Sequence, residues 1–209
     1  MPVTRIAVLA SGGGTNFQAI IDAVAAGRVA GEIVCLIYNR KAAYAAERAR
    51  AAGIPAVYVN RIACGGVEAF QQRVHEELVR CGADVVVLAG WLEILSADTV
   101  RRFHGKMINT HPALLPAFGG RGMYGHHVHE AVLAAGCKVS GCTVHFVEEG
   151  VDTGAIIAQH AVDVQPGDTA DTLAARILPH EHRLLAQAVA HLCAGRLRLV
   201  DGRAVQVQA

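Results

Sequence analysis

Asp84-Val-Val-Val-Leu-Ala89 is the stretch of sequence that decides the fold. Every residue after Asp84 is apolar, which is typical of a strand buried on both faces inside a parallel sheet. Similar runs lie at 5–10, 33–38 and 56–59, and stretches with helical periodicity lie at 16–26, 44–52 and 67–81. This alternation of strands and helices predicts a doubly wound, mostly parallel α/β sheet with helices on both faces.

After Trp91 the alternation becomes less regular. The pattern predicts helices at 96–103, 128–135 and 169–194, strands at 106–110, 140–147 and 155–162, and a Pro- and Gly-rich loop at 112–125. Ser96 is a candidate N-cap, and Pro179 should kink or split the last helix. Asp201-Gly202 between two short alternating runs predicts a C-terminal hairpin. With no internal repeat and no linker, residues 1–209 are expected to form a single domain.

Composition excludes several classes of protein. The chain has 209 residues, 53% of them hydrophobic, and a formal net charge of +1, so no nucleic-acid partner is expected. No apolar run reaches the roughly 20 residues that a membrane span needs. The six cysteines are scattered without a Cys-x-x-Cys pair, which favours reduced thiols and a cytoplasmic location. Small-molecule substrates are expected, and the sequence leaves both a monomer and a homodimer open.

Ser11-Gly-Gly-Gly-Thr-Asn16 lies between the first predicted strand and the first helix. Glycines allow close backbone approach to a ligand, and the helix amino terminus favours an anion such as phosphate. The segment is neither a dinucleotide fingerprint, because Phe17 stands where the last glycine is needed, nor a P-loop. A tight turn without a ligand explains this segment equally well.

Asn109-Thr-His-Pro-Ala-Leu-Leu-Pro116 begins at the carboxyl end of a predicted strand, where open α/β sheets bind ligands. Alternation along the strand puts Asn109 and His111 on one side. An amide can stabilise an oxyanion and an imidazole can move a proton, which suits acyl transfer to an amine without a covalent intermediate. The alternative is that both side chains only satisfy loop backbone.

An acidic loop, Glu148-Glu-Gly-Val-Asp152, follows the strand that contains Thr143-Val-His-Phe-Val147. If Asp152 reaches His111, its charge would favour the protonated imidazole and could position a bridging water. The alternative is a solvated turn. His126, His127 and His129 match zinc spacing poorly, so no metal is expected. Glu181 could bind ribose hydroxyls, although most helical glutamates face solvent.

In this order and at this spacing, four segments resemble the glycinamide ribonucleotide formyltransferases of purine biosynthesis: 10–20, 84–95, 109–116 and 143–154. The resemblance implies a Rossmann-like formyltransferase. In its reaction, the glycinamide amine attacks the formyl carbon of 10-formyltetrahydrofolate directly, giving formylglycinamide ribonucleotide and tetrahydrofolate without a metal.

The resemblance also implies roles for particular residues. Asn109, His111 and Asp152 match the catalytic trio of the family. Gly14, Thr15, Asn16 and Glu181 match the ribonucleotide side. The folate-binding positions are Leu92, Glu93, Ile94, Leu95, Asn109, Glu148, Glu149, Gly150, Val151 and Asp152.

Two departures from the family pattern concern folate affinity, because the family often has Arg where this chain has Glu93 and Val67. Alternatives also stay open. Related formyltransferases with other acceptors and formyltetrahydrofolate hydrolases share the Asn-x-His-Pro core, but they usually carry a further domain, for which 209 residues are not expected to leave room. A non-catalytic nucleotide-binding module would not need Asn109, His111 and Asp152 together.

Overall fold

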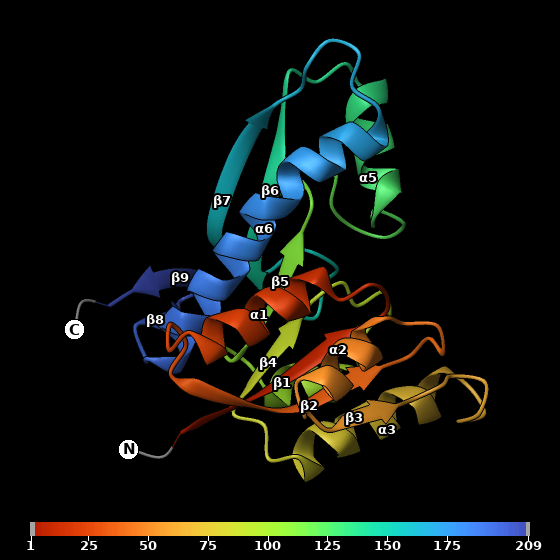
Figure 1. Ribbon diagram of the computed structural model, residues 1–209, viewed down its shortest axis with the longest axis vertical. Helices are drawn as coiled ribbons and strands as arrows, with labels where there is room; N and C mark the ends of the chain where they lie inside the picture. Colours follow the sequence, from red (N-terminus) through yellow and green to blue (C-terminus); the bar gives the residue numbers. More distant parts are fainter. Residues whose placement is uncertain (1–2, 208–209) are drawn as a thin grey trace.

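The computed structural model describes residues 3–207, and one sheet of seven strands runs through it in the order β3-β2-β1-β4-β5-β6-β7 (Figure 1). The strands are β1 (Thr4–Ala10), β2 (Gly31–Tyr38), β3 (Ala56–Tyr58), β4 (Val85–Leu88), β5 (Met107–His111), β6 (Val139–Phe146) and β7 (Ile156–Asp163). The first five pair in parallel, whereas β6 is antiparallel to β5 and β7 is antiparallel to β6. The predicted doubly wound, mostly parallel α/β fold is confirmed.

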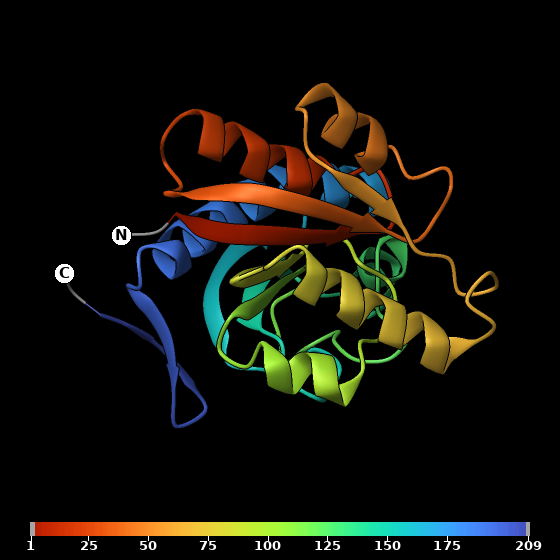
Figure 2. The same cartoon turned by 90° about the horizontal axis from the view of Figure 1, so that it is seen from below.

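Helices cover both faces of the sheet (Figure 2). They are α1 (Thr15–Ala25), α2 (Ala45–Ala51), α3 (Val67–Arg80), α4 (Ala97–Arg102), α5 (His126–Ala134) and α6 (Ala170–Cys193). Side chains of α1, α2 and α6 pack in one apolar cluster, and those of α3 and α4 pack in the other.

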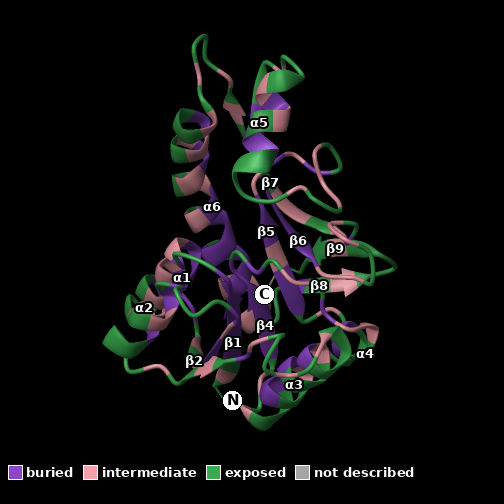
Figure 3. Cartoon of the chain, turned by 90° about the vertical axis from the view of Figure 1, so that its right-hand side faces the viewer, coloured by how far each residue is buried: buried purple, intermediate pink, exposed green. Residues whose placement is uncertain are grey.

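The central strands supply both clusters by alternation. In β1, Ile6 and Val8 point into the cluster beneath α1 and α6, while Ala7 and Leu9 point toward α3 and α4. All four residues of β4 are buried, as the run that decides the fold predicts (Figure 3). The central strands are therefore buried on both faces up to the carboxyl ends of β4 and β5.

Two local predictions, one at the start of α4 and one inside α6, have different outcomes. The Ser96 hydroxyl accepts a hydrogen bond from the Thr99 amide at 3.2 Å, which confirms the N-cap of α4. Of the two outcomes predicted for Pro179, a kink or a split, the split does not occur, because α6 runs without interruption from Ala170 to Cys193. Proline removes one backbone hydrogen bond, but buried leucine and isoleucine side chains hold the helix on the sheet on both sides of it, among them Leu173, Ile177, Leu184 and Leu185.

The predicted hairpin at the end of the chain is confirmed by β8 (Leu197–Val200) and β9 (Arg203–Gln206). Asp201 and Gly202 between them have φ of 47° and 70°, as a two-residue turn with both residues left-handed requires. Within residues 3–207, no helix combines the length and the apolar character needed to cross a bilayer.

Candidate active site

A cleft of about 390 Å³ opens where β4 and β5 end, between the loops that follow β4, β5 and β6. Its lining includes every residue predicted to bind folate: Leu92, Glu93, Ile94, Leu95, Asn109, Glu148, Glu149, Gly150, Val151 and Asp152. His111 lines the same cleft. The three residues of the predicted trio therefore come together at the carboxyl end of the sheet.

Asp152 lies between two imidazoles inside this cleft. Its Oδ2 is 3.5 Å from Nδ1 of His111, and its Oδ1 is 3.6 Å from Nε2 of His145. The side chains of His111 and Asp152 are only 4% and 10% exposed. Because water is largely excluded, the charge of Asp152 acts on His111 with little screening. Asp152 adopts a left-handed φ of 56°, which turns its side chain back toward β5.

The two nitrogens of His111 have different surroundings. Nε2 lies 2.8 Å from the carbonyl oxygen of Phe118, and since a carbonyl only accepts, Nε2 carries a proton that it donates there. Nδ1 faces Asp152, and His111 is part of the lining of the cleft. Nδ1 is therefore the nitrogen able to exchange a proton with a molecule in the cleft.

Asn109 is oriented by His145, a residue that the sequence reasoning missed. Nδ1 of His145 donates to the Phe146 carbonyl at 2.8 Å, so Nε2 is left to accept from the Asn109 amide at 3.2 Å. Burial lowers the pKa of His145, which keeps the ring neutral and able to accept. Asn109 pairs with His145 in the β5–β6 ladder, and this pairing depends on a cross-strand register that alternation along one strand does not specify.

The loop at 112–125 has a role that the sequence did not reveal. Its Phe118 carbonyl holds His111, and its Gly120 amide donates to Asp152 Oδ2 at 3.0 Å. A Cβ on Gly119 would lie 2.5 Å from Leu115 Cδ2 and 3.4 Å from Asp152 Cβ. A larger residue at 119 would therefore have to displace the Leu115 side chain beside Asp152.

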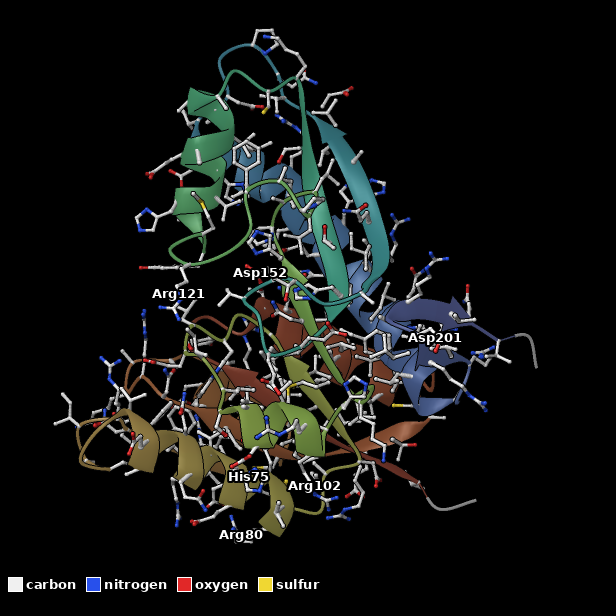
Figure 4. The ribbon with its side chains drawn as sticks, turned by 180° about the vertical axis from the view of Figure 1, so that it is seen from behind. His75, Arg80, Arg102, Arg121, Asp152 and Asp201 are labelled. Atoms are coloured by element: carbon white, nitrogen blue, oxygen red, sulfur yellow. The ribbon has the colours of Figure 1, made fainter. Side chains whose placement is uncertain are left out.

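The start of that loop is anchored to the sheet by Thr143. Its hydroxyl donates to the Ala113 carbonyl at 2.6 Å and accepts from the Leu115 amide at 3.0 Å. Gln159 on β7 donates to the Thr143 hydroxyl at 3.0 Å and to the Leu115 carbonyl at 2.9 Å. Arg121, in contrast, lies at the outer end of the loop, away from Asp152 (Figure 4).

The residues predicted for the ribonucleotide side lie next to the cleft rather than in its lining. Asn16 donates a hydrogen bond to Glu181 at 3.4 Å, and Glu181 accepts another from Thr110 at 3.5 Å. Of these three residues, Thr110 lines the cleft. The Ser11 hydroxyl also accepts a hydrogen bond from the Leu92 amide at 3.0 Å. Gly14 and Thr15 begin α1 in the same loop. The glycine-rich loop and the cleft are thus neighbouring parts of one surface.

Glu181 is not the solvent-facing glutamate that is usual on a helix. The residue is 7% exposed, and burial raises the pKa of its carboxyl group to about 7, while the hydrogen bonds from Asn16 and Thr110 act in the opposite direction. The Oδ1 atom of Asn16 is itself buried and has no partner within residues 3–207. A ligand that donates a hydrogen bond to Asn16 Oδ1 would satisfy this atom.

Charged side chains form the rim of the cleft. Glu93 lies 3.5 Å from Arg61, and Glu149 lies 2.9 Å from Arg101 on α4. Both pairs are substantially exposed, so each contributes little to stability. His126, His127 and His129 all lie on α5. Among the described residues, no group of three or more His, Cys, Asp or Glu side chains is arranged to hold a metal ion.

Comparison with protein families gives one match over most of the chain. The family model described as "Formyl transferase" matches residues 4–189. The chain is 42% identical over 197 residues to the chloroplastic phosphoribosylglycinamide formyltransferase of Arabidopsis thaliana, covering 93% of this chain and 67% of that one. It is 43% identical over 195 residues to the trifunctional purine biosynthetic protein adenosine-3 of Bos taurus, of which it spans 19%.

A solved structure agrees with these sequence matches. The crystal structure of glycinamide ribonucleotide transformylase 1 from Symbiobacterium toebii superposes with a TM-score of 0.93 at 41% identity. The superposition covers 99% of this chain and 95% of that one. These matches confirm the resemblance to glycinamide ribonucleotide formyltransferases that was seen in four segments of the sequence.

Proposed function

This chain belongs to the formyl transferase family, and from that premise we propose that it transfers the formyl group of 10-formyltetrahydrofolate to the amine of glycinamide ribonucleotide. The products are formylglycinamide ribonucleotide and tetrahydrofolate. The family implies the folate co-substrate, and the relatives named for this activity support the acceptor. The observation that carries the assignment is the burial of Asp152 against His111, beside Asn109, in a cleft lined by all predicted folate positions.

In the proposed reaction, the acceptor amine attacks the formyl carbon and a tetrahedral oxyanion forms. Asn109 donates an amide hydrogen to that oxyanion, and His145 orients the amide by accepting its other hydrogen. As the intermediate collapses, the bond between the formyl carbon and the folate nitrogen breaks. His111 relays the proton from the amine to that nitrogen through Nδ1, assisted by Asp152.

The ribonucleotide is proposed to bind beside the cleft, with its phosphate at Gly14, Thr15 and Asn16 and a ribose hydroxyl at Glu181. The reaction as proposed needs no metal, because the developing charge is neutralised by hydrogen bonds and a proton relay. We further propose one functional domain over residues 1–209, a cytoplasmic location, small-molecule substrates only and a monomer or homodimer.

The decisive measurement is the release of tetrahydrofolate from 10-formyltetrahydrofolate, with and without glycinamide ribonucleotide. We expect release to require the ribonucleotide and to match the formylglycinamide ribonucleotide formed. Release without an acceptor would instead indicate a hydrolase. Asp152→Asn is the matched control, since it removes charge with little change in shape, and it should slow transfer strongly without unfolding the protein.

A further inference from the structure

Three successive carbonyl groups of the glycine-rich loop are held by the protein. The Gly12 carbonyl accepts from the Ala45 amide at 3.2 Å, and the Gly14 carbonyl accepts from the Gln18 amide at 2.9 Å. Between them, the Gly13 carbonyl accepts from Nε of Arg48 at 2.8 Å. The middle anchor is thus the only charged one of the three.

These anchors fix the direction of the next amide groups. In a trans peptide the carbonyl of one residue and the amide of the next point in opposite directions. The amides of Gly13, Gly14 and Thr15 therefore point away from the groups that hold the loop. Within residues 3–207, no protein group accepts a hydrogen bond from the amides of residues 12–17. An anionic ligand bound at this helix start would therefore meet no competing acceptor for these amides among the described residues.

Arg48 is well placed to hold this arrangement. It lies on α2, which is packed so closely on the loop that a Cβ at Gly14 would be 2.8 Å from Ala45 Cβ (Figure 1). Its Nη1 donates to Gln18 Oε1 at 3.1 Å, and its guanidinium lies 5.1 Å from the centre of the Tyr44 ring. The guanidinium is thus held on three sides.

We propose that Arg48 is a positioning residue for the phosphate of the acceptor: it holds the Gly13–Gly14 peptide so that its amide faces the phosphate, and it places a positive charge behind the loop. This inference rests on the proposed function. It predicts that Arg48 governs recognition of the phosphate end of the substrate while the formyl-transfer groups work independently of it. Charge-assisted hydrogen bonds of this kind are stronger than neutral ones.

The test compares Arg48→Met with a matched control on the same helix. Arg50→Met removes an arginine two residues further on, which pairs with Glu47 and does not touch the loop. For Arg48→Met we expect the KM for glycinamide ribonucleotide to rise roughly tenfold, the size associated with losing one hydrogen bond to a charged group. The turnover number and the KM for 10-formyltetrahydrofolate should stay close to normal. Arg50→Met should leave all three constants unchanged.

A substrate without phosphate makes the test specific. With glycinamide riboside, kcat/KM should be low and the same in the wild type and in Arg48→Met, because there is no phosphate to lose. An equal loss on riboside and ribonucleotide would overturn the proposal, as would an unchanged KM for the ribonucleotide. Arg48→Lys keeps a cation but not the planar donor pair, so its KM for the ribonucleotide should lie between those of the wild type and Arg48→Met. If Arg48→Met does not fold, the test uses Arg48→Lys in its place.

Binding of inorganic phosphate, measured by calorimetry, separates this proposal from the proposed function. We expect the wild type and Arg50→Met to bind phosphate alike and Arg48→Met to bind about tenfold more weakly. If the wild type binds phosphate in this Arg48-dependent way but does not formylate the ribonucleotide, the acceptor assignment fails and the role of Arg48 stands. If phosphate binding does not depend on Arg48, the role of Arg48 fails whatever the acceptor is.

Discussion

Two glycine-rich loops border the proposed active site, and they differ in how their backbone amides are used. The loop after β1 turns its carbonyls into the protein, and no described residue of the chain accepts from its amides at 12–17. The loop after β5 uses both kinds of backbone group within the protein, because its Phe118 carbonyl accepts from His111 and its Gly120 amide donates to Asp152. Glycine content alone therefore does not identify a ligand-binding loop. What distinguishes the two is whether the amides have a partner within the protein.

The largest effect is expected at Asn109, which lies in the same cleft as His111 and Asp152, the partners of the second loop. Asn109→Ala removes the proposed oxyanion donor and should lower the turnover number by a factor of about 10²–10³ at saturating substrates. His145 would keep its place in β6, so circular dichroism should be unchanged. Near-normal turnover would refute the role of Asn109.

Glu181, which joins the two regions through Asn16 and Thr110, should show its burial as a pH effect on stability. A carboxyl whose pKa rises from 4.5 to about 7 on folding binds more protons in the folded state between these values. Its contribution to stability is therefore full below about pH 4.5 and falls as the pH rises to about 7. The total loss is on the order of 3 kcal/mol. Denaturant unfolding of Glu181→Gln should lack this decline, and a parallel decline in both proteins would show that Glu181 is not the cause.

Adding one methyl group to each loop tests whether the two loops differ in how closely they are packed. Gly119→Ala places a Cβ against Leu115 and should cost about 1–3 kcal/mol of unfolding free energy. It should also lower turnover, since Asp152 lies beside the new atom. Gly13→Ala meets no atom within 4 Å and should leave stability nearly unchanged. Equal destabilisation of the two variants, measured by urea unfolding, would contradict the difference between the loops.

The smallest expected effect concerns the rim of the cleft. Glu93 pairs with Arg61 at the rim, so a polyglutamate tail on the cofactor would find little net positive charge there. Each exposed unit-charge contact is worth about 0–1 kcal/mol. We therefore expect similar Michaelis constants for mono- and pentaglutamate cofactor at two ionic strengths. Glu93→Arg should favour the pentaglutamate, and a large salt-sensitive preference in the wild type would show that the expectation is wrong.

The central parallel strands were predictable from sequence because they are apolar on both faces. The separate β8–β9 hairpin was predictable because its Asp201-Gly202 turn carries its own signal. Asn109 and His111 were recognisable because they share one strand. His145 was not, since its contact with Asn109 depends on the antiparallel register of β6, which no local pattern specifies. The glycines at 119 and 120 were unexplained for the same reason: their partner, Asp152, is 32 residues from Gly120 along the chain. Local sequence signals therefore predict the helices and strands, whereas the site depends on contacts between residues on different strands and loops.

The pairing of Asn109 with His145 also limits which changes of chain length this protein tolerates. Because successive residues of a strand point to opposite faces, one residue gained or lost within β6 before His145 would turn the imidazole to the opposite face of the sheet. Asn109 would lose its acceptor even though every functional side chain was still present. An added residue at the Asp201-Gly202 turn would alter only the β8–β9 hairpin. Insertions and deletions that preserve activity should therefore be found in the C-terminal hairpin and not in β6.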